Sequence, residues 1–157
     1  GWGWCPQSTS GPHSTAYVVH GLQTAKAADV AVPQGMIDRG VNWLVNYQKG
    51  EVTKIANWMV RTKDDKKPKK PQADNLDAFV AMILADAGKS NAKMLEYLDR
   101  DRTKLSIYAV AMLGLTFDTL DKTDQRDMCL RNVKQYLVID DATQLLDCGY
   151  SRVSPFV

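Results

Sequence analysis

The amino-acid sequence predicts an all-α protein in which apolar helices alternate with amphipathic ones. The 157 residues, 45% hydrophobic and 24% charged, have the length and composition of one globular domain. Apolar residues recur every three to four positions over most of the chain, which is the helical period. No segment alternates apolar and polar residues long enough to predict a strand, although Val138-Ile139 is ambiguous.

We expect about seven helices in this order: 14–26, 34–47, 52–61, 75–88, 92–99, 103–117 and 123–138. Capping residues mark several of their ends. Pro33 stands just ahead of the second helix. Asp74 and Ser90 can cap the fourth and fifth helices, and Thr103 or Asp101 can cap the sixth. Gly88 is a typical C-terminal stop for the fourth.

The expected helices are of two kinds. The first, fourth and sixth are apolar or small on almost every side, so they must be covered on every side. The second, fifth and seventh carry one apolar stripe, so they belong half-exposed in an outer layer. The apolar unit also recurs: Ala109 lies 31 positions after Ala78, and Ala16 lies 62 before it. This recurrence predicts a helical repeat or toroid, with an irregular bundle as the alternative.

A basic, proline-containing loop is predicted over residues 62–73. Between Arg61 and Lys70 the chain has six basic and two acidic residues, and Pro68 and Pro71 break any helix there. We interpret it as a solvated connection, with docking on a phosphate or acidic surface as the alternative. A nucleic-acid partner is not expected, because the net charge is only +2. No apolar run approaches the roughly 20 residues of a membrane span.

Histidine and cysteine offer little catalytic chemistry. Cys5, Cys129 and Cys148 are widely spaced, so neither a zinc site nor any other metal or cofactor site is expected. We place His13 ahead of the first helix, where it is exposed, and His20 in the core with a backbone partner. A Cys5–His13 nucleophile is disfavoured because no third orienting group or oxyanion motif is evident. No catalytic residue is therefore assigned.

Tryptophans surround the first glycines of the chain. Trp2 and Trp4 flank Gly3 just before the first helix. Such residues are expected to close a layer of helices by stacking on the next helix end, with an aromatic cup for a ligand as the alternative.

Several motifs, taken together in order, resemble the thioester-containing domain of bacterial alpha-2-macroglobulin-like proteins. They are GWGW (1–4), PHSTAYVVHGL (12–22), RGVNWL (39–44), ADNLDAFV (73–80), DRDRTKLSIYA (99–109) and RNV (131–133). The resemblance covers residues 1–144 and leaves 145–157 as a tail unlike the family. It implies an alpha/alpha toroid within a periplasmic or otherwise extracytoplasmic bacterial protein. In that family a cleaved bait region exposes an internal thioester, which attaches covalently to the attacking protease.

The thioester itself is expected to be missing from this chain. In the family it joins a cysteine to a glutamine three positions on, whereas Ser8, Asn132 and Ser151 follow the three cysteines here at that spacing. In relatives it precedes the GWGW segment. The chain is thus expected to be part of a thioester domain, with no enzymatic activity. Target proteases would be its partners through the full-length parent.

An incomplete toroid should leave surface of its inner helices uncovered, so we also expect self-association or a rearrangement of the ends that covers this surface. One competing hypothesis is a small toroid enzyme acting on a glycan or isoprenoid-like ligand. Its cavity would be formed by Trp2, Trp4 and His13. Such an enzyme needs a carboxylate pair facing the cavity, and the inner helices offer only Asp77 and Asp86, which are nine positions apart and so point differently. Another is a plain interaction scaffold.

Overall fold

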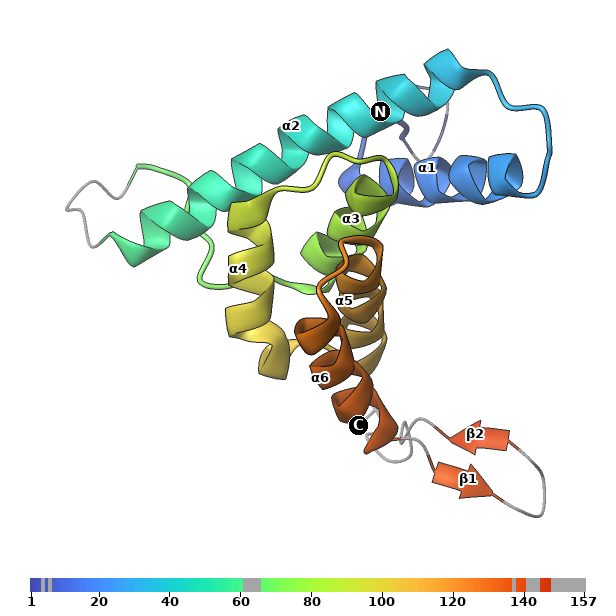
Figure 1. Ribbon diagram of the computed structural model, residues 1–157. Coiled ribbons are helices and arrows are strands. Elements are labelled where there is room, and N and C mark those ends of the chain that lie inside the picture. Colours follow the sequence, from blue (N-terminus) through green and yellow to red (C-terminus); the bar gives the residue numbers. More distant parts are fainter. Residues whose placement is uncertain (4, 6, 61–65, 137, 141–144, 148–157) are drawn as a thin grey trace, which may run out of the picture.

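The protein is all-α, as predicted (Figure 1). The computed structural model describes residues 1–3, 5, 7–60, 66–136, 138–140 and 145–147. Its elements are α1 (Pro12–Ala27), α2 (Gln34–Met59), α3 (Asn75–Asp86), α4 (Ala92–Asp101), a 3-10 turn (Arg102–Lys104), α5 (Ile107–Thr119), α6 (Thr123–Lys134), β1 (Val138–Asp140) and β2 (Leu145–Asp147). The strands form a small antiparallel hairpin in which Val138 pairs with Asp147, which resolves the ambiguity at 138–139. The rest of the predicted tail, 148–157, lies outside the described residues.

The described part of the chain has six α-helices instead of about seven, because two predicted helices are one. α2 continues without a break through the polar residues 48–51, which lie between the predicted helices 34–47 and 52–61. Gln48 and Glu51 of that stretch are buried, and Glu51 accepts a hydrogen bond from Lys70 Nζ at 2.9 Å. A buried anchor on this turn keeps it helical even though Gly50 lacks helix propensity. The last helix ends at Lys134 rather than at 138.

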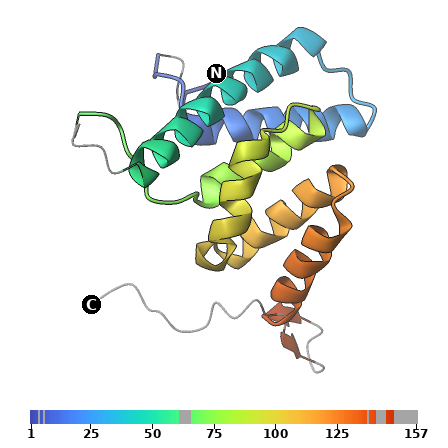
Figure 2. The same ribbon diagram turned by 60° about the vertical axis from the view of Figure 1, so that its left-hand side comes forward.

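The apolar helices neighbour one another, because α3 contacts both α1 and α5, and α2 contacts α3 and α4. Figure 2 shows α3 near the middle of the molecule. One apolar core joins α1, α2 and α3 around Val19, Leu44 and Ile83. A second joins α4, α5 and α6 around Leu98 and Leu113.

Burial on every side is confirmed for α3 only. Every residue from Asp77 to Ala85 is buried. The prediction is wrong for α1 and α5, where Tyr17 is 60% exposed, Tyr108 51% and Leu115 58%. The physical reason is position: α3 is flanked by α1, α2, α4 and α5, whereas α1 and α5 stand at the two ends of the row.

The predicted helix ends are partly confirmed. Pro33 is the N-cap of α2, and Asp74 caps α3 in a reciprocal capping box with Asp77. Gly88, with φ +66°, follows α3 in the left-handed region that favours glycine. Two caps are wrong. Asn91, one residue after Ser90, accepts the cap hydrogen bonds of α4. Thr103 lies in the 3-10 turn before α5 instead of capping it.

Candidate functional site

The N-terminal tryptophan motif is part of the packing. Trp2 N donates to Thr15 Oγ1 at 2.8 Å, and Thr15 Oγ1 donates back to Trp2 O at 3.2 Å. The Trp2 ring lies against Gly40 of α2, where an added Cβ would fall 2.6 Å from Cζ3. Trp2 therefore packs against the side of α2, and not on the end of a helix as predicted. Trp4 lies outside the described residues.

The two histidines join an aromatic cluster instead of a catalytic one. His13 is exposed as predicted but lies in the first turn of α1, not ahead of it. Its ring centroid is 4.8 Å from that of Tyr17, which is 5.2 Å from Phe79. His20 meets the same Phe79 edge-on at 5.8 Å. The buried Nδ1 of His20 has no hydrogen-bond partner among the described residues, so the expected backbone partner is not seen there.

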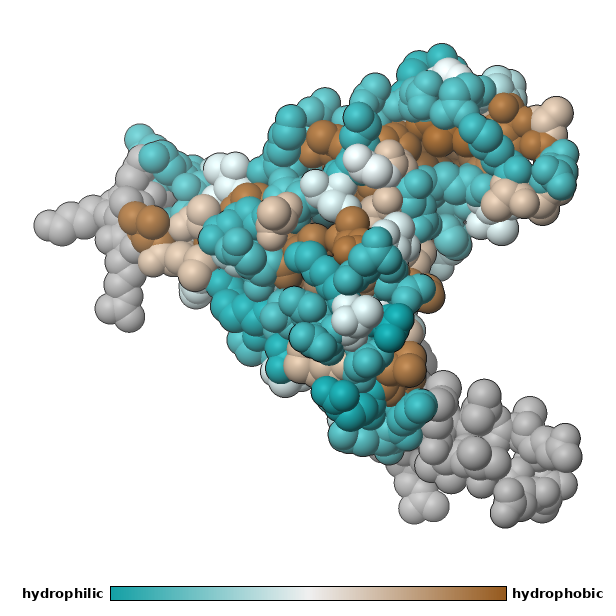
Figure 3. All heavy atoms as spheres, viewed as in Figure 1, coloured by the Kyte–Doolittle hydropathy of each residue, from teal (hydrophilic) through white to brown (hydrophobic). Residues whose placement is uncertain are grey.

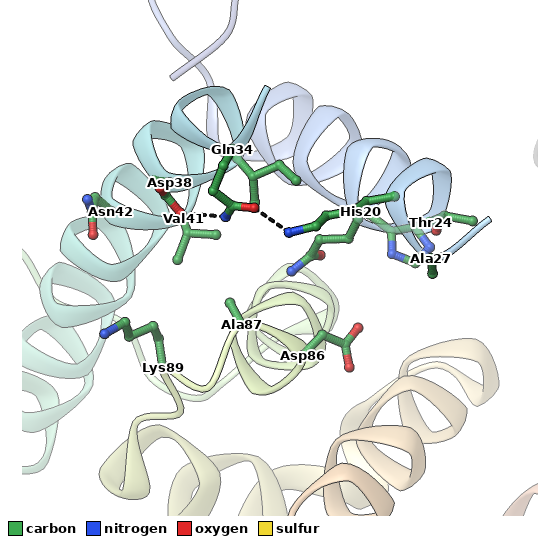
Figure 4. A pocket seen from close by; sticks show the side chains of 13 residues that line it. His20, Thr24, Ala27, Gln34, Asp38, Val41, Asn42, Asp86, Ala87 and Lys89 are labelled. Atoms are coloured by element: carbon green, nitrogen blue, oxygen red, sulfur yellow. Dashed lines mark hydrogen bonds between the residues drawn. The ribbon is translucent and has the colours of Figure 1, made fainter. Parts of the chain in front are cut away.

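A polar cleft of about 990 Å³ lies between α1, α2 and the C-terminal end of α3 (Figure 4). Figure 3 shows an apolar strip between α1 and α2. Gln34 accepts from Lys26 and donates to Asp38 at 2.9 Å across one side of the cleft. Gln23 is held by a 3.1 Å hydrogen bond to Ile83 O. The residues that form the cleft include His20, Gln23, Asp38, Asn42, Asp86 and Lys89.

The cleft does not bring the residues of the enzyme hypothesis together. His13 and Trp2 are not among its lining residues, and of the two carboxylates only Asp86 is. Asp77 lies in the first turn of α3, at the opposite end of the helix from Asp86. The polar lining residues of α2 were not identified from sequence, since charged residues on an amphipathic helix are normally its solvent face.

A partly buried ion cluster ties the start of α3 to α2. Lys70 Nζ lies 2.6 Å from Asp77 Oδ2, 2.8 Å from Asp74 Oδ2 and 2.9 Å from Glu51 Oε2. Lys54 Nζ approaches the other oxygen of Glu51 at 2.5 Å. The interpretation of Lys70 as part of a solvated loop is therefore wrong. Lys70 is four residues before Asp74 and seven before Asp77, and this spacing could have suggested an ion pair. The contact with Glu51 could not be predicted in this way, because Glu51 is 19 positions away.

Burial and ion pairing act against each other in this cluster. Burial raises the pKa of Asp77 to about 6 despite its hydrogen bond from Lys70. Burial opposes ionisation of Lys70, but hydrogen bonds to Asp74, Asp77 and Glu51 outweigh it and raise the pKa of the ammonium. Burial would also raise the pKa of Glu51, yet hydrogen bonds from Lys54 and Lys70 lower it. The cluster acts as a clamp on the chain entering α3.

The two described cysteines differ in their surroundings. Cys5 is exposed, whereas Cys129 is buried between α5 and α6, and burial raises the pKa of its thiol. Cys148 lies outside the described residues. Within the described ranges, no group of three or more His, Cys, Asp or Glu side chains could hold a metal ion. No helix there is long and apolar enough to cross a membrane.

An apolar groove between α5 and α6 is the strongest candidate for an interaction surface. It has a volume of about 420 Å³, and exposed Leu115 and Leu130 belong to its walls. Asp118 and Arg126, 3.0 Å apart, stand at its polar side. The remaining lining residues are Ala111, Gly114, Cys129 and Val133. The sequence shows that the sixth predicted helix is apolar, but it does not show which face of that helix the rest of the chain leaves exposed.

Comparison of the chain with protein-family models, with curated proteins and with solved structures found no match.

Proposed function

We propose that this chain is part of the thioester-type domain of a bacterial alpha-2-macroglobulin-like, protease-trapping protein. Its own role is structural: it supplies helical layers and an interaction surface, and it performs no catalysis. Its partners are the remaining helices of the domain in the parent and, through that parent, target proteases in the periplasm or another extracytoplasmic space. The observation that carries the proposal is the open row of apolar helices, α1–α3–α5, with uncovered apolar side chains at both ends.

The motifs behind the family resemblance support the proposal because they meet in space. Trp2, Thr15 and Gly40 come from three separate motifs and pack together. Two further motifs are joined near the starts of α3 and α5. Asn75 Oδ1 accepts from Ser106 N at 2.9 Å, and Asp101 Oδ2 accepts from Ala73 N at 2.9 Å. Residues that are distant in sequence thus contact one another in the fold.

The uncovered surface supports an interaction role. A terminal layer of a helical repeat needs a polar outer face to remain soluble. The α5–α6 end instead exposes Leu115, Leu130 and Tyr108. Each apolar side chain gains about 1.5–3 kcal/mol when it is fully covered. In the parent, further helices of the domain cover this end, and in the isolated chain a second copy does so.

The parentage is tested by methylamine labelling of the intact parent protein, read by mass. The amine nitrogen attacks the thioester carbonyl, an amide forms on the former glutamine, and the cysteine leaves as a thiol. Incorporation at an upstream Cys-x-Glu-Gln, abolished by replacing that cysteine with alanine, supports the proposal. A parent without that motif and without incorporation would instead be the plain interaction scaffold.

Self-association is tested on the chain itself by sedimentation velocity over a range of concentrations. We expect dimers or larger species from the wild type and a monomer from the double variant Leu115→Glu, Leu130→Glu. Val30→Glu is the matched control, because Val30 is an exposed apolar residue on another part of the molecule. A wild type that stays monomeric at high concentration would contradict the coverage of this surface by a second copy.

A further inference from the structure

The polar cleft between α1, α2 and the end of α3 has walls that are joined to one another (Figure 4). Gln34 accepts from Lys26 and donates to Asp38 at 2.9 Å, which joins α1 to α2. Gln23 Nε2 donates to Ile83 O at 3.1 Å, which joins α1 to α3. The cleft has a volume of about 990 Å³. Sites for ligands are concave and largely preformed, and this cleft has both properties.

Three of its side chains, Lys26, Gln34 and Asp38, form a line that we call the polar row. The ammonium of Lys26 can only donate, and the ionised carboxylate of Asp38 can only accept. Among the described residues each of the two makes its side-chain hydrogen bond to Gln34 alone, and all three residues are exposed. The polar row therefore offers a ligand a donor at one end and an acceptor at the other.

The α1 wall of the cleft has hydrogen-bonding capacity that the described residues leave unused. The buried Nδ1 of His20 and the buried Oε1 of Gln23 have no hydrogen-bond partner among them. Buried polar atoms without a partner are uncommon in folded proteins. Both residues line the cleft, and they lie about one helical turn apart. The wall is therefore better suited to a polar ligand than to an apolar one.

The rest of the lining favours a ligand without net charge and with some apolar surface. Figure 4 shows Val41 and Ala87 on opposite walls of the cleft. The charged lining residues are two lysines and two aspartates, whose formal charges cancel: Lys26, Lys89, Asp38 and Asp86. A phosphate or a nucleotide is disfavoured, because a cleft concentrates anions when charges of one sign line it.

We propose that the cleft binds an extended, uncharged segment of a peptide chain along the polar row. The N–H and C=O groups of one residue in an extended chain point to the same edge. The C=O group accepts from Lys26, and the N–H group donates to Asp38. Small apolar side chains of the peptide contact Val41 and Ala87. This inference does not depend on the family to which the parent protein belongs.

A helix and a saccharide fit this lining less well. A helix uses its backbone N–H and C=O groups in its own hydrogen bonds, so it has none to offer the polar row. A sugar ring packs best on an open aromatic face. Among the described lining residues the one aromatic ring is that of His20, which already meets Phe79 edge-on at 5.8 Å.

The test is a titration of the full chain with the blocked peptide acetyl-Ala-Leu-Ala-Ser-Ala-amide, followed by the NMR shifts of the protein's backbone amides. We expect saturable shifts at residues of the cleft. The same peptide methylated on its backbone nitrogens should bind at least about tenfold more weakly, because it cannot donate to Asp38. Asp38→Ala and Lys26→Met should each weaken binding of the unmethylated peptide about tenfold. Circular dichroism verifies that each variant is folded.

Matched controls separate the polar row from other charged residues. Lys49→Met and Asp124→Ala remove an exposed lysine and an exposed aspartate that do not line the cleft. Both variants should bind the peptide like the wild type. The proposal is overturned if the peptide gives no saturable shifts in the cleft, if the methylated peptide binds equally well, or if the polar-row variants lose no more than the controls. It is also overturned if maltotriose or inorganic phosphate occupies the cleft while the peptide does not.

Discussion

α3 and α5 are built from similar residues but differ in their surroundings. Both are rich in alanine, valine, leucine and methionine. α3 is buried from Asp77 to Ala85, whereas α5 exposes Tyr108 and Leu115. The apolar composition of a helix predicts that it is stable when buried. It does not predict whether other helices of the same chain bury it. The difference marks α5 as the apolar helix that the described part of the chain leaves partly exposed.

Paired leucine truncations give the largest expected contrast between these helices. Leu84→Ala in α3 should cost about 3 kcal/mol of unfolding free energy, because Leu84 is fully buried and its removal leaves a cavity. Leu115→Ala in α5 should change it by less than about 0.5 kcal/mol. Urea denaturation at low protein concentration measures both. Equal losses would mean that Leu115 is covered in solution.

The polar start of α3 can be tested by removing its central cation. Lys70→Met leaves three carboxylates without their shared ammonium, and Asp77 among them is fully buried. We expect a loss of about 3 kcal/mol in unfolding free energy by chemical denaturation. Lys93→Met is the matched control, because the Lys93–Glu96 pair is exposed and its loss should change little. A small loss for Lys70→Met would refute the clamp.

The same cluster predicts that the stability of the fold depends on pH. The pKa of Asp77 is about 6 in the folded protein and about 3.9 in an unfolded chain. Between these values the folded state holds a proton that the unfolded state has released, so stability from this group falls as pH rises from 4 to 6. Compared with Asp77→Asn, the wild type should lose about 2 kcal/mol between pH 4 and 7. Parallel stability curves for the two proteins would rule this out.

Alanine substitutions at two glycines should change the free energy of unfolding in opposite directions. Gly40→Ala should destabilise by about 1–2 kcal/mol, because the new methyl group would lie 2.4 Å from Val19 Cγ2 and 2.6 Å from the Trp2 ring. Gly21→Ala should stabilise by about 0.5–1 kcal/mol, since an alanine Cβ there meets nothing within 4 Å. Thermal unfolding of both variants decides whether the tryptophan motif is packed as described.

Local rules predicted the parts of the structure that local chemistry determines. Asp74 and Gly88 bound α3 because capping and left-handed backbone preferences act within a few residues. The continuity of α2 was missed, because Gln48 and Glu51 are helical through burial and a contact with the distant Lys70. The partial exposure of α1 and α5 was also missed, because an apolar sequence pattern does not show which neighbouring helices are present. The toroid and the protease-trap assignment stay predictions.

The hydrogen bonds that hold the chain on either side of residues 61–65 determine whether residues can be inserted there. Asn57 bonds Pro68 O, and Lys70 N donates to Lys54 O at 3.1 Å. The two flanks are thus fastened to the same stretch of α2, whatever the length of chain between them. Each doubling of the length of a loop between fixed ends adds only about 0.6 kcal/mol of closure entropy. Added residues or an inserted reporter sequence at this point should therefore leave the helical body intact.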